Sequence, residues 1–168
     1  MAKKPNQKLR LLYLMKILSE QTDENHALTV KELSDRLEKY EIPVERKTLY
    51  DDIEQLRAYG MDIERIRVGQ AHQYYVANRT FELAELKLLV DAVQSSKFIT
   101  HRKSTELIKK VESLASVHEA QLLQRQVYVT NRIKTMNESI YYNIDAVHSA
   151  ISMGRQVTFL YSEWVIAF

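Results

Sequence analysis

The chain has 168 residues, of which 45% are hydrophobic, a share that supports an ordered core and excludes a disordered tail. Its formal net charge at pH 7 is only +2, so any affinity for a polyanion must come from where the cations lie and not from their sum. The absence of cysteine excludes disulfide frameworks, thiolate metal sites and cysteine nucleophiles.

The sequence also bears on the cellular compartment. Its apolar runs are all shorter than the roughly 20 residues that a membrane-spanning helix needs. The first five residues, Met-Ala-Lys-Lys-Pro, lack the apolar stretch of a signal peptide. We therefore expect a cytoplasmic protein without a membrane partner.

Two amphipathic helices are predicted in the first 40 residues. The first covers about residues 6–21, where apolar side chains recur at helical spacing. The second covers about residues 30–40 and begins with a capping box, in which Thr29 and Glu32 each satisfy a free amide of the other. A short link containing Pro43 follows, which is typical of a helix-turn-helix.

A third helix is predicted between Pro43 and Gly60, with a cationic start and a glycine at its end. Its apolar residues Leu49, Ile53 and Leu56 fall on one face, which we expect to pack on the core. The opposite face should point outward, and it carries Lys47, Asp51, Glu54 and Ala58.

The first turn of this third helix is the main candidate for a binding site. Arg46, Lys47 and Thr48 lie there, where a helix that enters the DNA major groove presents side chains to base edges and phosphates. Tyr50 flanks the same surface. Asp51 repels phosphate, although its carboxylate can accept a hydrogen bond from the amino group of cytosine.

A β-hairpin is predicted directly after the third helix. Residues 61–76 alternate apolar and polar side chains around a turn at Gly69. Arg65 and Arg67 are expected on the polar side of the first strand, where they would position DNA through its phosphates. Three helices followed by such a hairpin make a winged helix-turn-helix domain, which we place at residues 6–78.

Positive charge is local in this part of the chain. Residues 1–80 contain nearly as many acidic as basic side chains. Lys8 belongs to a cationic N-terminal segment and is expected to contact phosphate, although such charges are often simply solvated. Each phosphate contact would release counterions and steepen the salt dependence of binding.

The chain changes character after residue 78. Two further amphipathic helices are predicted, and since neither can bury its apolar stripe alone, they should pair with each other or with a second subunit. They cover residues 81–96 and 101–117; beyond them we predict a brief strand at 127–129, a helix at 140–153 and a strand at 156–161.

Four segments of the chain resemble the bacterial WYL-domain transcriptional regulators. They read Val-Glu-Arg-Lys-Thr-Leu-Tyr-Asp-Asp-Ile-Glu-Gln-Leu-Arg (44–57), Phe-Glu-Leu-Ala-Glu-Leu (81–86), Ile-Asp-Ala-Val-His-Ser-Ala-Ile (144–151) and Gln-Val-Thr-Phe-Leu-Tyr (156–161). The resemblance covers nearly the whole chain and implies a winged helix, a helical linker, an Sm-like β-barrel effector domain and a homodimer. By this resemblance, Arg46, Lys47 and Thr48 match the basic opening of the family's recognition helix.

The chain departs from that family in two places. It ends at Phe168 with one barrel strand begun, before the strand with the Trp-Tyr-Leu signature and the basic residues that contact ligand, so we expect a truncated member without an effector ligand. Asp51 also stands where relatives often carry arginine. The expected fold is therefore mainly α: a winged helix-turn-helix at 6–78, a helical linker and dimerisation region at 79–138, and the first helix and strand of an incomplete WYL domain at 139–168.

Catalysis finds little support in the sequence. The five histidines are scattered without the spacing of metal ligands, and a core or surface role is more common for such residues. Asp51 and Asp52 are adjacent on a helix and point about 100° apart, so they cannot share an acid–base site, and Asp52 is expected to form a salt bridge at the core edge. We expect no enzyme, no cofactor and no metal.

Two functions therefore remain open. The first is a transcriptional regulator that recognises double-stranded DNA sequence-specifically through the third helix and the hairpin, as a homodimer. The alternative is a protein-interaction or scaffold module, including a truncated partner that dimerises with a full-length regulator. The near-neutral charge and the acidic Asp51 and Glu54 keep this alternative open.

Overall fold

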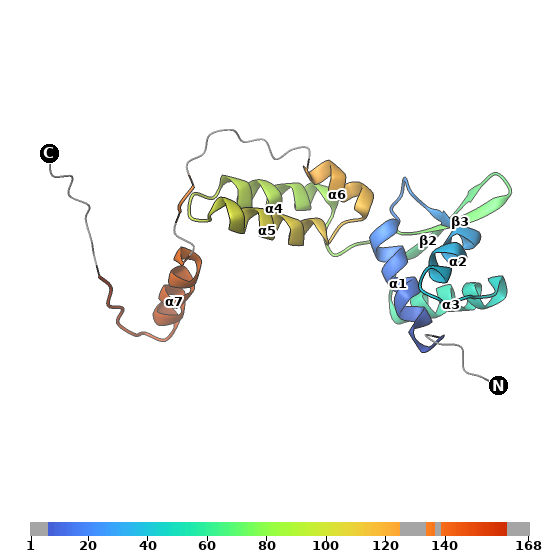
Figure 1. The fold of residues 1–168 in the computed structure, drawn as a ribbon, viewed down its shortest axis with the longest axis horizontal. Coiled ribbons are helices and arrows are strands. Elements are labelled where there is room, and N and C mark those ends of the chain that lie inside the picture. Colours follow the sequence, from blue (N-terminus) through green and yellow to red (C-terminus); the bar gives the residue numbers. More distant parts are fainter. Residues whose placement is uncertain (1–6, 125–133, 137–138, 161–168) are drawn as a thin grey trace.

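A computed structural model describes residues 7–124, 134–136 and 139–160. This part of the protein is mainly helical and contains a small three-stranded antiparallel sheet. Figure 1 shows the elements spread along one long axis, with residues 7–76 at one end, residues 83–124 in the middle and residues 140–152 at the other end. The candidate site therefore lies at one extremity of the molecule.

The three helices predicted before residue 60 are present. A short 3-10 helix, η1 (Gln7–Leu9), leads into α1 (Arg10–Gln21), which is followed by α2 (Val30–Glu38) and α3 (Arg46–Tyr59). The predicted capping box is confirmed, because the Glu32 amide donates to the Thr29 hydroxyl and the Thr29 amide donates to the Glu32 carboxylate. Gly60 adopts a φ of +111° and ends α3, as predicted.

The predicted hairpin is also present, as β2 (Ile63–Val68) and β3 (Ala71–Val76) with a turn at Gly69. A two-residue strand that the sequence did not predict, β1 (Leu28–Thr29), pairs with β3 on its other side. Two residues carry too little alternation to indicate a strand, and β1 exists only because β3 lies beside it. This pairing fixes the start of α2 against the hairpin.

A hydrophobic core joins α1, α2, α3 and the sheet. Asp52 lies at its edge, where Arg10 donates to the carboxylate from Nε at 2.5 Å and from Nη2 at 2.9 Å, as the predicted salt bridge requires. The members with no solvent exposure are Leu14, Ile17, Leu18, Leu33, Leu37, Ile42 and Leu49.

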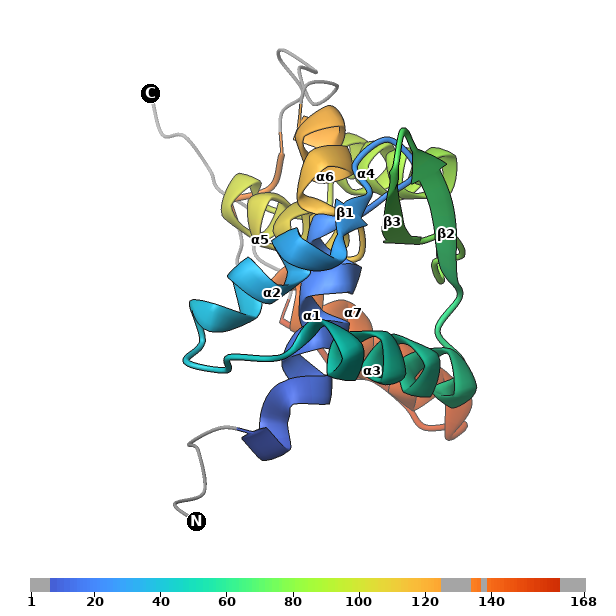
Figure 2. The ribbon, with the colours of Figure 1, turned by 90° about the vertical axis from the view of Figure 1, so that its right-hand side faces the viewer.

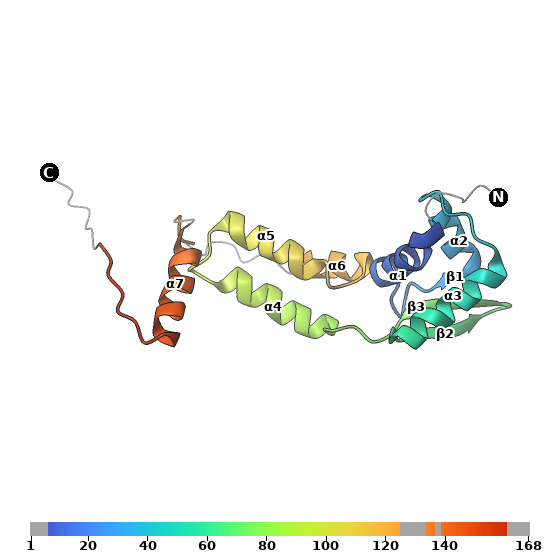
Figure 3. The same ribbon diagram turned by 90° about the horizontal axis from the view of Figure 1, so that it is seen from below.

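A second core lies among the helices that follow the sheet, α4 (Leu83–Ser95), α5 (His101–Glu112) and α6 (Val117–Gln124). Figure 3 shows α4 and α5 side by side, with α6 between α5 and α1. The two predicted helices therefore pack against each other, which was the first of the two expected arrangements. The core consists of Leu86, Val90, Ile108, Ala115 and Leu123.

The prediction of one helix over residues 101–117 was wrong. The helix ends at Glu112, and α6 is a separate helix that begins at Val117. The sequence contains the signal for this break, since Ser116 and Glu119 form a capping box in which the Glu119 amide donates to the Ser116 hydroxyl and the Ser116 amide donates to the Glu119 carboxylate.

The last described helix is α7 (Ile140–Ser152), which matches the predicted helix and is closed by Gly154 at a φ of +61°. The strand predicted over residues 156–161 is not formed at residues 156–160. Alternation alone is insufficient, because an extended segment becomes a strand only when another strand supplies its hydrogen bonds. Tyr161 and the strand predicted at 127–129 lie outside the described residues.

Within residues 7–124, 134–136 and 139–160, each helix is too short or too polar to cross a lipid bilayer.

Candidate nucleic-acid interface

The two faces of α3 are as predicted. Leu49, Ile53 and Leu56 are buried, with at most 5% of their surface exposed. Lys47 and Asp51 are exposed on the opposite side, and their side chains form no hydrogen bond or ion pair with any residue that the structure describes. The outward face of the first turn of α3 is therefore available to a partner.

Arg46 is exposed at the start of α3, but its side chain is held in place by Tyr50. The guanidinium group donates to the Tyr50 hydroxyl from Nε at 3.0 Å and from Nη2 at 2.9 Å, and its central carbon lies 5.6 Å from the centre of the Tyr50 ring. Tyr50 itself is half-buried, and its ring lies 6.5 Å from that of Tyr74 on β3. Arg46 is thus tied to the sheet through two aromatic rings.

Thr48 and Lys8 differ in how well they suit a contact with DNA. Thr48 is half-buried on the flank of α3 away from Tyr50, whereas Lys8 in η1 is exposed. Arg10, two positions after Lys8, forms an ion pair with Asp52. The cationic N-terminal segment therefore supplies one exposed lysine in its described part.

Arg65 and Arg67 are exposed, but they do not lie on the opposite, polar face of β2 as predicted. In the hairpin register Arg65 lies across from Tyr74 and Arg67 from His72. Opposed and alternate residues share a face, so both arginines lie on the same side as buried Ile63 and Tyr74, beyond the edge of the core. The alternation of apolar and polar residues is broken after Ile63, which is why the pattern predicted the wrong face for these arginines.

The cations of β2 therefore lie on the side of the sheet that faces α3. Tyr74, on that side, is the ring that contacts Tyr50. Near the hairpin tip, the Nε atom of Arg67 donates to the carbonyl oxygen of Gly69 at 3.2 Å. The exposed arginines of the hairpin and the first turn of α3 therefore lie on the same side of the molecule.

A hollow of about 540 Å³ opens between the start of α2, the start of α3 and the start of β3. Two cationic side chains, Lys31 and Arg46, line it together with His72 and one carboxylate, Asp35. Its remaining lining residues are Thr29, Val30, Ser34, Tyr50 and Ala71.

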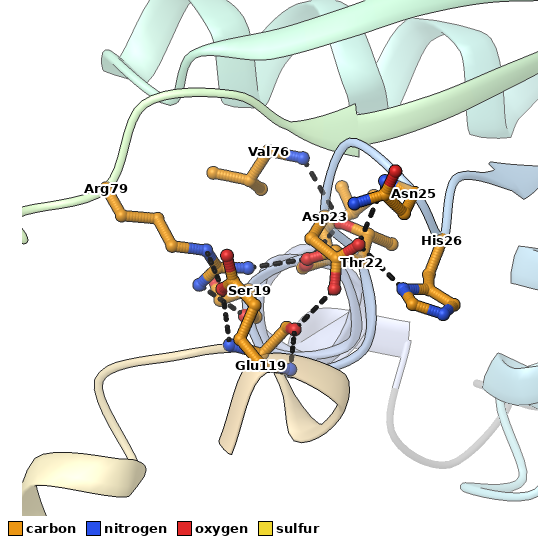
Figure 4. A network of polar contacts seen from close by, with 10 residues as sticks. Ser19, Thr22, Asp23, Asn25, His26, Val76, Arg79 and Glu119 are labelled. Atoms are coloured by element: carbon orange, nitrogen blue, oxygen red, sulfur yellow. Dashed lines mark hydrogen bonds and ion pairs between the residues drawn. The ribbon is translucent and has the colours of Figure 1, made fainter. Parts of the chain in front are cut away.

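A second polar cluster lies where α6 meets the end of α1 (Figure 4). The buried carboxylate of Asp23 accepts hydrogen bonds from the Ser116 hydroxyl at 2.5 Å, from His26 Nδ1 at 2.7 Å and from the Asn25 amide at 3.0 Å. The ring of His26 stacks on that of His118 at 3.7 Å. No local pattern predicts the contact between Asp23 and Ser116, because the two residues are 93 positions apart.

Arg79 also belongs to this polar cluster. Its guanidinium group donates to the carbonyl oxygens of Ser19 and Thr22, at 2.8 and 2.6 Å, and lies 3.7 Å from the Glu119 carboxylate. The Thr22 hydroxyl in turn accepts from the Val76 amide. The cluster connects α1, β3 and α6 and thereby joins the two hydrophobic cores.

The arrangement at Asp23 does not support nucleophilic catalysis. A serine nucleophile needs a hydrogen bond to its base, whereas Ser116 and His26 each donate to Asp23 and not to each other. Burial would raise the pKa of the Asp23 carboxyl, but the hydrogen bonds from Ser116, His26 and Asn25 outweigh it and hold this pKa below its ordinary value of 3.8. Asp23 is therefore a charged structural acceptor.

A serine–lysine pair also occurs, in the second core. The ammonium group of Lys134 donates to the Ser104 hydroxyl and to the Val93 carbonyl oxygen, and burial lowers the pKa of Lys134. Ser104 has only 2% of its surface exposed, so a substrate cannot reach its hydroxyl. The pair anchors residue 134 to α4 and α5. Among the described residues, no group of three or more histidine, aspartate or glutamate side chains could hold a metal ion.

No protein-family model matches the chain, and no curated protein matches it.

Proposed function

We propose that this protein is a transcriptional regulator that binds double-stranded DNA through α3 and the β2–β3 hairpin. The observation that carries the proposal is the exposed face over the first two turns of α3, where Lys47 and Asp51 are without partners among the described residues and Arg46 lies beside them. The exposed arginines of β2, Arg65 and Arg67, lie on the side of the sheet that faces this turn.

The order of elements supports a winged helix-turn-helix in which α2 and α3 form the helix-turn-helix and the hairpin forms the wing. In such folds the second helix of the pair enters the major groove by its N-terminal residues. The resemblance to the WYL-domain regulators extends this proposal to a homodimer, with α4–α6 as the linker and α7 as the first helix of an effector domain. Two subunits would then read two half-sites.

Localised cations would supply the affinity, since the net charge of the chain is only +2. Lys8, Arg46, Lys47, Arg65 and Arg67 are all exposed on or near this end of the molecule. Each of them that contacts a phosphate would add about −0.9 to the slope of log K against log salt. Binding that depends steeply on salt is therefore a direct consequence of the proposal.

An electrophoretic mobility shift with fragments from upstream of the protein's own gene tests the proposal. Wild-type protein is expected to shift a specific fragment in the presence of competitor DNA, and the double variant Arg46→Ala, Lys47→Ala is expected to lose at least about 1–3 kcal/mol of specific binding free energy. A matched control removes the same charge elsewhere, with Arg102→Ala and Lys109→Ala on the exposed surface of α5. Equal specific affinity in wild type and double variant would overturn the proposal.

The second candidate is a protein-interaction module, and one observation favours it. An apolar hollow of about 520 Å³ lies between α1 and α3, lined by Leu11, Leu12, Met15, Leu56 and Tyr59 among others. Exposed apolar surface of this kind is typical of protein interfaces. Salt distinguishes the two functions, because an apolar protein interface responds weakly to salt whereas multiple phosphate contacts respond steeply.

A further inference from the structure

Arg46 does not lie on the outward ridge of α3, although it opens the cationic turn. Successive residues of a helix are turned by about 100°, so Lys47 and Asp51 lie together near the centre of the outward face. Arg46 and Tyr50 lie together on one flank. That flank faces β3, as the contact between the rings of Tyr50 and Tyr74 shows.

The hydrogen bonds of Arg46 hold it on this flank. Nε and Nη2 both donate to the Tyr50 hydroxyl, and the central carbon of the guanidinium group lies 5.6 Å from the centre of the Tyr50 ring. Two donors at one edge of the guanidinium fork are thereby occupied. A guanine base is usually read by two such donors on a side chain that extends into the groove. Lys47 and Asp51, by contrast, have no partner among the described residues.

The hollow beside Arg46 has the chemistry of a site for one singly charged anion. Lys31 from α2 and His72 from β3 line it together with Arg46, so donors come from three different elements. Asp35 also lines the hollow, and a carboxylate there disfavours a multiply charged ligand. A phosphodiester carries one negative charge and two oxygen acceptors, which these donors match.

We propose that this hollow receives one backbone phosphodiester of the bound DNA, held by Arg46, Lys31 and His72, and that Lys47 and Asp51 read the bases. This inference rests on the proposed function. Arg46 is then a positioning residue that sets the depth and direction of α3 in the groove, with Tyr50 holding its side chain. Asp51, which repels phosphate, is suited to accept from a cytosine amino group.

Salt titration of duplex binding separates the two roles. Affinities of Arg46→Ala and Lys31→Ala are measured by fluorescence anisotropy on the selected duplex and on a random duplex, over a series of salt concentrations. Each variant is expected to lose a similar factor on both duplexes, and the slope of log K against log salt should become shallower by about 1. The control Arg102→Ala, which removes an exposed arginine on α5, should change neither quantity.

Base preference is the second readout. Selection from randomised duplexes is expected to return the same preferred sequence for Arg46→Ala as for wild type, with weaker binding. Asp51→Asn, which keeps the size of the side chain, is expected to change the preferred base at one position and to leave the salt slope unchanged or slightly steeper. A changed base preference in Arg46→Ala, with an unchanged slope, would overturn the proposal.

Neutral phosphates identify the contact itself. Duplexes in which one phosphate at a time is replaced by an uncharged methylphosphonate should bind wild type more weakly at one position than at its neighbours. Arg46→Ala should be insensitive to that same replacement. Tyr50→Phe removes the acceptor hydroxyl and keeps the ring, so its sensitivity to that replacement should lie between those of wild type and Arg46→Ala. This variant replaces Arg46→Ala in the test if Arg46→Ala folds poorly. Equal sensitivity of wild type and Arg46→Ala at every phosphate would overturn the proposal.

Two further outcomes are distinguishable from these. Inorganic phosphate at matched ionic strength is expected to leave duplex binding unchanged. If millimolar phosphate displaces the duplex from wild type but not from Arg46→Ala, the hollow is a site for free phosphate. That result would overturn its assignment to the DNA backbone. If wild-type protein binds no duplex at any salt concentration, the proposed function fails, whereas duplex binding with an unaltered salt slope in Arg46→Ala and Lys31→Ala refutes only the division of roles.

Discussion

Neighbouring side chains of α3 have different roles, depending on whether they are buried with a partner or exposed. Asp51 and Asp52 are adjacent, yet Asp52 is buried in an ion pair with Arg10 while Asp51 is exposed. The helical period predicted this division, because it places Asp52 beside the apolar stripe. It could not show that Arg10 would be the partner, since that contact spans 42 positions of the chain.

Removal of Arg10 tests the role of this ion pair. Arg10→Met leaves the buried Asp52 carboxylate without its charged partner, which is expected to destabilise the protein by about 3 kcal/mol. Urea denaturation at neutral pH measures the loss. The double variant Arg10→Met, Asp52→Leu removes both charges and should recover much of the stability; a single variant as stable as wild type would show that the ion pair contributes nothing.

Helix ends were the most predictable elements, and single strands were the least. The capping box at Thr29 and the glycine at residue 60 were read correctly because their signals are local. The box at Ser116 is equally local, although the predicted helix over residues 101–117 runs across it. In contrast, β1 and the absent strand at 156–160 depend on whether another strand lies alongside, which no local pattern contains.

The end of α3 gives a test at this scale. The space around Gly60 is open, so a Cβ added there would meet no other atom within 4 Å. A substitution would therefore be strained only by the left-handed φ of +111°. Gly60→Ala is expected to destabilise the protein by about 1 kcal/mol. Gly60→Asn should be less destabilising, because asparagine tolerates positive φ. Thermal unfolding monitored by circular dichroism checks both, and equal stability of Ala and Gly would contradict the assigned cap.

The junction between α6 and α1 gives a second test. Ser116→Ala removes both the cap of α6 and the hydrogen bond to Asp23. Amide hydrogen exchange is expected to speed up in α6 and to remain slow in α2 and α3, whose contacts are unaffected. Ser113→Ala is a matched control, because the Ser113 hydroxyl donates only within its own turn, to the Lys110 carbonyl oxygen. Unchanged exchange in α6 would show that Ser116 does not hold the junction.

At the scale of the whole molecule, two hydrophobic cores are joined by one polar cluster around Asp23 and Arg79. Figure 2, which looks along the long axis, shows α6 next to α1 and the hairpin standing beside them. Periodicity alone predicted helices at the positions of α1 to α5 and α7, but it did not predict α6 as a separate helix. It could not predict the junction of the two cores, since His26 and His118, like Asp23 and Ser116, come together only in the folded chain.

Asp23 makes stability depend on pH. Its pKa in the folded protein lies below the ordinary value of 3.8, so the folded state favours the carboxylate. The resulting stabilisation is fully present above pH 3.8 and is lost as the pH falls through the lower, folded-state pKa. Urea denaturation should therefore show wild type more stable than Asp23→Asn at pH 6, with a smaller difference at pH 3. A difference that grows on acidification would contradict this.

We propose that the end of the molecule that carries α3 and the hairpin recognises DNA. Selection of genomic DNA fragments by the purified protein, followed by sequencing, tests it most directly. Fragments that share one motif are expected to be enriched, and the variant Arg46→Ala, Lys47→Ala is expected to lose this enrichment. Fragments recovered without a shared motif, or the same motif recovered with the variant, would contradict it.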